Sequence, residues 1–102
     1  MRSIHPQGEL MDAAIALARE IADNTSAVSV AMTRAMLWRL STEDHPMEAH
    51  KVDSRSIYRL SRGGDAKEGI ASFLEKRAPE YPDTVSGDMP DFYPWWEEPE
   101  YK

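Results

Sequence analysis

The sequence contains no cysteine, which excludes a disulfide framework and a thiolate metal site. It has no apolar run approaching the ~18 residues of a membrane span, and its N-terminus lacks the basic-then-apolar order of a signal peptide. Basic residues are scarce, with 12 lysines and arginines against 18 acidic residues and a net charge of −6. We therefore expect a cytoplasmic protein that binds neither a membrane nor nucleic acid.

The negative charge is confined to the C-terminal part of the chain. Residues 1–77 hold eleven acidic and eleven basic side chains, whereas residues 78–102 hold seven acidic side chains and one lysine. A chain of 102 residues is long enough for one domain with a modest core. The sequence thus predicts a neutral body followed by an acidic tail.

Four segments show helical periodicity or helix boundary signals, at residues 8–23, 26–40, 46–62 and 65–77. The first is amphipathic, with Leu10, Leu17 and Ile21 on one face. The second is apolar nearly all round and is predicted to be buried, with Thr25 or Ser26 as its cap. Such a helix needs neighbours on more than one side. The segments together predict an all-α fold, an orthogonal four-helix arrangement.

Local signals place the ends of the last two helices. Pro46 suits a first helical position after Asp44 or His45 as cap. We expect Gly63-Gly64 to close the third helix in a left-handed conformation. Asp65 and Glu68 have the spacing of a capping box at the start of the fourth. We expect Ala78-Pro79 to stop this helix.

Residues 82–102 are predicted to form an irregular acidic tail, because prolines recur among acidic residues there. The tail also contains a cluster of apolar and aromatic residues, namely Met89, Phe92, Tyr93, Trp95 and Trp96. Such a cluster usually needs a surface to lie on. We therefore divide the chain into a helical domain, residues 1–81, and a tail, residues 82–102.

Few residues are candidates for chemistry. One flank of the third helix carries a cationic stripe, consisting of Lys51, Arg55, Arg59 and Arg62. The stripe is either an anion site or, as we favour, a solvated face that neutralises the acidic tail. Glu68 and Glu75 lie two helical turns apart, too far for a catalytic carboxylate pair. The three histidines lack metal-ligand spacing, so we expect no metal, no cofactor and no catalytic residue.

The segment from Asp65 to Tyr81 resembles the closing signature of the enoyl-CoA hydratase/isomerase (crotonase) family, D-x-x-E-G-x-x-A-F-x-E-K-R-x-P followed by an aromatic residue. Ser72 departs from it, standing where the family has alanine. The resemblance covers residues 1–81 and implies the family's C-terminal helical domain. It also implies that Met1 falls just after the last core strand, so that this chain is a piece of a longer enzyme.

The resemblance implies that Phe73 and Lys76 lie near the adenine and phosphate end of coenzyme A. Phe73 and Lys76 are three positions apart, so the spacing predicts that they lie beside each other on one helix face. Apart from the resemblance, we expect Phe73 to be a core residue and Lys76 to interact with the negative end of the helix dipole. The implied parent reaction is hydration of a 2-enoyl-CoA, a step of fatty acid metabolism. Its catalytic glutamates and oxyanion hole belong to the earlier part of the enzyme, so we expect this chain alone to be inactive.

Two roles therefore stand open. The first is a lid and oligomerisation segment of an acyl-CoA enzyme, which in isolation forms a homo-oligomer with exchanged helices to cover its second helix. The alternative is a stand-alone helical interaction module whose aromatic tail docks on a partner protein.

Overall fold

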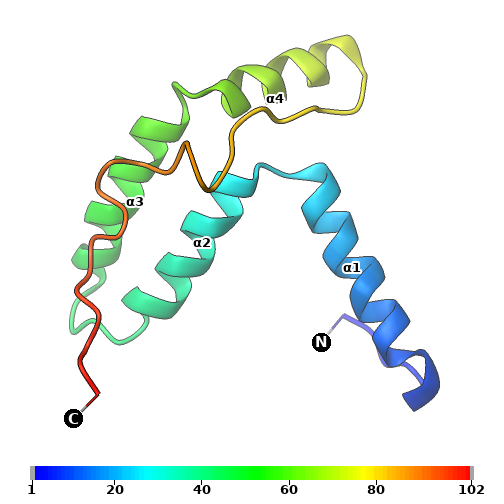
Figure 1. Cartoon of the computed structure of the whole chain (residues 1–102), viewed down its shortest axis with the longest axis horizontal. Coiled ribbons are helices and arrows are strands. Elements are labelled where there is room, and N and C mark those ends of the chain that lie inside the picture. The colour runs from blue at the N-terminus through cyan, green and yellow to red at the C-terminus, as the bar shows by residue number, and fades with distance from the viewer. Residues whose placement is uncertain (1, 102) are drawn as a thin grey trace.

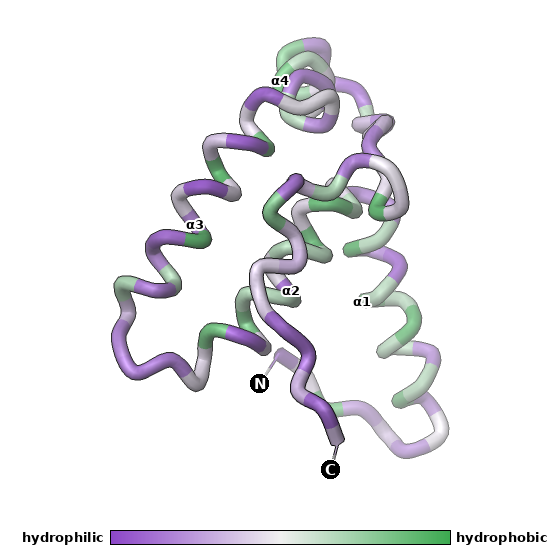
Figure 2. Tube along the Cα trace, turned by 60° about the vertical axis from the view of Figure 1, so that its left-hand side comes forward, coloured by the Kyte–Doolittle hydropathy of each residue, from purple (hydrophilic) through white to green (hydrophobic). Residues whose placement is uncertain are grey.

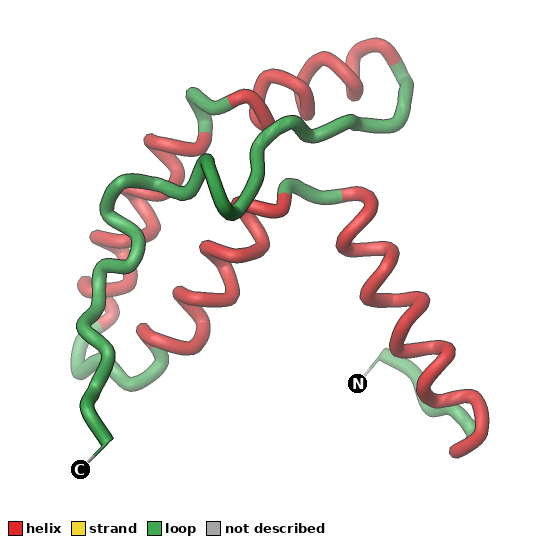
Figure 3. Tube along the Cα trace, viewed as in Figure 1, coloured by secondary structure: helices red, strands yellow, loops and turns green. Residues whose placement is uncertain are grey.

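The computed structural model describes residues 2–101. It contains a short 3-10 helix, Gln7–Glu9, and four α-helices, which are α1 (Leu10–Asn24), α2 (Ala27–Leu40), α3 (Pro46–Leu60) and α4 (Gly64–Glu75) (Figure 1). The described residues form no strand, and long irregular segments make up the rest (Figure 3). The prediction of an all-α fold is therefore confirmed.

The core lies where α2 packs against α3. Val28, Met32 and Ala35 form a buried stripe on α2, at the i, i+4, i+7 spacing of one helix face. Val52 and Ser56 are the buried residues of α3. The Ser56 hydroxyl donates to the Val52 carbonyl oxygen at 2.7 Å, so this polar group is satisfied inside the core.

The helix α1 diverges from the α2–α3 pair (Figure 1) and buries none of its residues. Hydrophobic residues nevertheless recur along its length (Figure 2). The radius of gyration is 16.7 Å, whereas a compact chain of this length would have about 13 Å. The fold is therefore open, with an amphipathic helix whose apolar face is uncovered. No helix among the described residues is both long and apolar enough to cross a membrane.

The tail turns back across the helices and runs beside α2 and α3, orange to red in Figure 1. Pro90 is among the most completely buried side chains of the molecule. The Arg55 guanidinium of α3 lies 5.0 Å from the Phe92 ring, and the Arg39 guanidinium of α2 lies 4.5 Å from the Trp96 ring. The expectation that the aromatic cluster needs a surface is met by the chain's own helices.

The caps of α2 and α3 are each one of the two alternatives that the sequence predicted. The Ser26 hydroxyl oxygen accepts from the backbone N–H of Ser29 at 3.1 Å, which satisfies a free donor at the start of α2. The His45 side chain accepts from the backbone N–H of Met47 at 3.0 Å, and Pro46 occupies the first helical position of α3.

The turn between α3 and α4 differs from the prediction. No described glycine has a positive φ, and Gly63 is extended, with φ −75° and ψ 175°. Ser61, in a right-handed conformation, is the C-cap of α3, and Gly63 is the N-cap of α4. Space explains the glycines better, because a Cβ on Gly64 would lie 2.7 Å from an Asp83 carboxylate oxygen.

The predicted capping box is also wrong. The Asp65 carboxylate accepts from the backbone N–H of Asp83 at 2.9 Å, and the Asp83 carboxylate accepts from the backbone N–H of Asp65 at 3.2 Å. This reciprocal pair satisfies a free donor at the start of α4 and ties residues 81–84 to it. A partner 18 positions away replaces the local cap because the chain returns over the helix end.

We expect Asp83→Ala to lower the free energy of unfolding by about 1 kcal/mol, since it leaves a donor at the start of α4 unsatisfied. Asp83→Asn keeps an acceptor oxygen and should lose less. Urea unfolding followed by circular dichroism measures both. Asp91→Ala, at an exposed tail position, is the control. Equal losses for Asp83→Ala and Asp91→Ala would show that the pair contributes nothing.

Candidate functional site

The C-terminal end of α4 holds the residues that the sequence singles out for ligand binding. The helix ends at Glu75, and Lys76 has a left-handed conformation with φ 55° and ψ 40°. The backbone N–H of Arg77 donates to the Ser72 carbonyl oxygen at 3.1 Å, and that of Lys76 to the Phe73 carbonyl oxygen at 3.3 Å. These two bonds are those of a Schellman motif, with lysine where glycine is usual. Helix α4 thus stops two residues before the predicted end.

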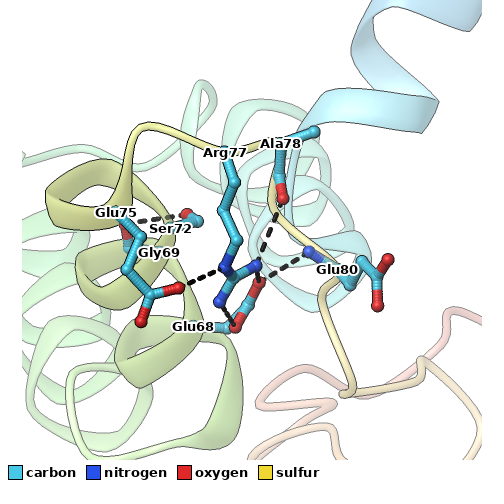
Figure 4. Close-up of polar contacts among 7 residues, drawn as sticks. All are labelled: Glu68, Gly69, Ser72, Glu75, Arg77, Ala78 and Glu80. Atoms are coloured by element: carbon cyan, nitrogen blue, oxygen red, sulfur yellow. Dashed lines mark hydrogen bonds and ion pairs between the residues drawn. The ribbon is translucent and has the colours of Figure 1, made fainter.

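The left-handed turn directs Arg77 back along α4 into a network of hydrogen bonds (Figure 4). Its guanidinium donates to both carboxylate oxygens of Glu68, at 2.6 and 2.9 Å, and to Glu75 at 2.6 Å. The backbone N–H of Glu80 donates to Glu68 at 2.7 Å. We call Glu68, Glu75 and Arg77 the α4 clamp. Sequence spacing missed it, because Glu68 and Arg77 are nine positions apart and only the reversal at Lys76 brings them together.

Electrostatic interactions in the α4 clamp keep the Glu68 carboxylate and the Arg77 guanidinium in their charged forms. Hydrogen bonds from the Arg77 side chain and then from the Glu80 backbone lower the pKa of Glu68 to about 2. The hydrogen bonds of Arg77 to Glu68 and Glu75 raise the pKa of its guanidinium further above neutrality. Neither group can exchange protons near neutral pH, so the clamp positions the backbone rather than serving as an acid or base.

Phe73 and Lys76 are not arranged as the helical spacing predicted. Phe73 is 81% exposed, and Ile70 and Leu74 beside it on α4 are also exposed. The prediction that Phe73 is a core residue is therefore wrong, because no described part of the chain packs on this face. Lys76 lies beyond the helix end, so it does not share a helix face with Phe73. Their contact with coenzyme A stays a prediction.

The four cations of the predicted stripe are exposed, and Arg62 lies beyond the end of α3 at Leu60. Lys51 forms an ion pair with Glu48 at 2.6 Å, and the Arg62 guanidinium lies 3.7 Å from the Tyr58 ring. The other two face the tail. Arg55 lies over Phe92, as described above. Hydrogen bonds from Thr84 lower the pKa of the Asp88 carboxyl, and the charge of Arg59 lowers it further.

Among the described residues only Lys51 of the four forms an ion pair, and its partner Glu48 belongs to α3 rather than to the tail. Both interpretations of the stripe, an anion site and a face that neutralises the tail, therefore stay predictions. Elsewhere, the described residues contain no group of three or more histidine, aspartate or glutamate side chains that could hold a metal ion.

A comparison of the sequence with known proteins identifies the family of the chain. The sequence model of the enoyl-CoA hydratase/isomerase family matches residues 1–84. The chain belongs to the enoyl-CoA hydratase/isomerase family. Three curated relatives are enoyl-CoA hydratases from Alternaria alternata. ACTT3 is 36% identical over 83 residues, AKT3-2 is 37% identical and AFT3-1 is 35% identical.

Each alignment covers 81% of this chain but only 27% of the relative. The chain thus spans about a quarter of the length of the enoyl-CoA hydratases that it matches. The matched residues include all four α-helices, the α4 clamp and the Asp65–Asp83 pair. The aromatic part of the tail, from residue 85 onward, lies outside the family match. The site at the end of α4 therefore lies wholly within the family match, whereas the aromatic extension that packs on α2 and α3 lies outside it.

The clamp predicts a specific dependence on pH. The pKa of Glu68 is lower in the folded chain than the ordinary value of 4.5. The ionised Glu68 therefore makes its full contribution to the free energy of unfolding above about pH 4.5, and this contribution is lost as the pH falls towards about 2. Glu68→Gln should therefore be less stable than the unmodified chain near neutral pH, and the two should converge in acid. Urea unfolding at a series of pH values measures the difference.

Glu80→Gln is the matched control, since residue 80 takes part through its backbone N–H and the substitution leaves that donor in place. This variant should keep the pH profile of the unmodified chain. A constant stability difference between Glu68→Gln and the unmodified chain at every pH would contradict the role of the ionised Glu68.

Proposed function

We propose that this chain is the C-terminal lid and oligomerisation segment of an enoyl-CoA hydratase that acts on acyl-CoA thioesters, with hydration of a 2-enoyl-CoA as the parent reaction. The family match over residues 1–84 supports the proposal, as do the relatives, which are enoyl-CoA hydratases of much greater length. On this proposal, the water-activating and oxyanion-binding groups lie outside the chain.

The uncovered apolar surface is the observation that carries the proposal. Helix α1 is amphipathic, yet it has no buried residue. Large apolar side chains are exposed on α1 and α4, among them Met11, Ile15, Ile70 and Phe73. Exposed patches beyond a few hundred Å² are unusual in monomers. We infer that these faces cover another part of the enzyme or a second subunit.

Phe73 and Lys76 give the segment a role at the substrate. An exposed aromatic ring can stack on a purine, and an exposed lysine can pair with a phosphate. The α4 clamp holds the turn that carries Lys76, which fixes where these two side chains stand relative to α4. On this proposal they meet the nucleotide end of coenzyme A, bound mainly by the absent part of the enzyme.

The docked tail favours this role over a stand-alone interaction module. The module would need the aromatic cluster for its partner, whereas Phe92 and Trp96 lie against arginines of α3 and α2. The surface left open is on the helices instead. The gene offers a further check, because an open frame upstream of Met1 that encodes a glycine-rich oxyanion segment would favour the enzyme.

We expect the purified chain to form a homo-oligomer through the apolar face of α1. Ala18→Glu places a charge in the middle of that face and should shift the chain towards monomer, because an unpaired buried charge is costly. Sedimentation velocity or light scattering measures the oligomeric state at several concentrations. Circular dichroism verifies that helix content is retained.

Ala16→Glu is the matched control, with the same substitution on the opposite face of α1, and both alanines are exposed. This variant should associate like the unmodified chain. A monodisperse monomer for the unmodified chain, or equal dissociation of both variants, would refute self-association through this face.

We also expect the isolated chain not to hydrate crotonyl-CoA and to bind coenzyme A only weakly, because most of a coenzyme pocket would be supplied by other parts of the enzyme. Glu68 and Glu75 are both engaged by Arg77 and cannot orient a water molecule together. A spectrophotometric hydration assay and calorimetric titration test this. Turnover that copurifies with the chain through two independent purification steps would overturn the proposal.

A further inference from the structure

A pocket of about 450 Å³ lies between α2 and the docked tail. Its lining comes from both segments and consists of Ala31, Arg34, Ala35, Trp38, Arg39, Tyr93 and Trp96. The tail residues lie outside the family match, which ends at residue 84. The pocket is therefore a feature of this chain's extension, separate from the end of α4 where coenzyme A is proposed to bind. We call it the α2–tail pocket.

The two arginines of the α2–tail pocket differ in their state. Arg39 forms an ion pair with Glu98 and lies over the Trp96 ring, so its charge is balanced within the chain. Arg34 forms no ion pair with any described residue. Its guanidinium lies 5.9 Å from the centre of the Trp38 ring. Arg34 thus offers a cation, held beside an aromatic ring, that is available to an anion.

Contacts within the tail hold Trp96, one of the two tryptophans that line the pocket, in place. Trp96 packs edge-to-face on Tyr93, with ring centres 5.3 Å apart, and on Trp95, with ring centres 4.8 Å apart. Its indole N–H donates to Glu98 at 2.6 Å, which fixes the ring orientation. Trp38 on α2 is 72% exposed and has no such restraint. Ala31 and Ala35 have small side chains, which leaves room between the walls.

We propose that the α2–tail pocket binds a small planar aromatic molecule that carries one anionic group. The ring would stack on Trp38 and Trp96, and the carboxylate or phosphate would pair with Arg34. The volume lies within the range of small-molecule sites. The Glu98 carboxylate, which is bonded to Arg39 and Trp96 of the lining, disfavours an extended polyanion, which would bring a second negative charge close to it.

Titration of the full chain with indole-3-acetate and with adenosine monophosphate tests the proposal, since the first supplies a carboxylate and the second a phosphate. Isothermal titration calorimetry gives the affinities, because the indole ring of two of the compounds has the same fluorescence as tryptophan. We expect saturable binding of at least one, and its identity shows which anionic group the pocket takes. Cyclohexane carboxylate lacks an aromatic ring and tryptamine carries a positive charge, so both should bind more weakly.

Arg34→Gln should weaken binding about tenfold, because a charged hydrogen-bond donor to the anion is lost. Arg19→Gln is the matched control, because Arg19 is an exposed arginine of α1 that does not line the pocket, and it should leave the affinity unchanged. Absence of saturation by both ligands below about 5 mM overturns the proposal. Equal affinity of the Arg34→Gln variant and the unmodified chain also overturns it. Neither result bears on the hydratase assignment.

Discussion

The structure depends on covering α2. This helix is apolar nearly all round, and its stripe of Val28, Met32 and Ala35 is buried. One flank is met by α3 and another by the tail, where Pro90 is fully buried. Because burial of apolar surface is the main favourable term in folding, removing either cover would expose the centre of the molecule. The tail is therefore part of the core, although its described residues form no helix or strand.

The end of α4 is set by polar contacts between residues that are distant in the sequence. A helix that continued through Lys76 would carry Arg77 onward, away from Glu68. The left-handed turn instead returns the chain along α4, where the α4 clamp and the Asp65–Asp83 pair hold it. A non-glycine residue at positive φ costs about 1 kcal/mol or more, and the charge-assisted bonds of Arg77 offset that cost. Residues 77–84 thereby lead the chain back towards α2, where the tail packs.

The sequence analysis predicted what depends on near neighbours. The helices fell within a few residues of their observed bounds, and the caps Ser26 and His45 followed from local chemistry. It missed the contacts between residues far apart, such as Arg77 with Glu68 and Asp83 with Asp65, because no periodic signal encodes a reversal at a single lysine. Phe73 was predicted to be a core residue because it lies on the apolar face of its helix. The periodicity of apolar residues does not show whether another segment of the chain packs on that face.

That distinction separates the two kinds of apolar surface in this protein. The stripe of α2 is covered internally by α3 and by an extension outside the family match, whereas α1 and the Phe73 face of α4, inside the match, have no cover. A segment selected to fold alone would be expected to cover both. On the proposed function, α1 and α4 face outward because their counterpart lies elsewhere, in the longer enzyme or in another subunit. The tail cannot substitute for it, since its aromatic residues are already engaged with α2 and α3.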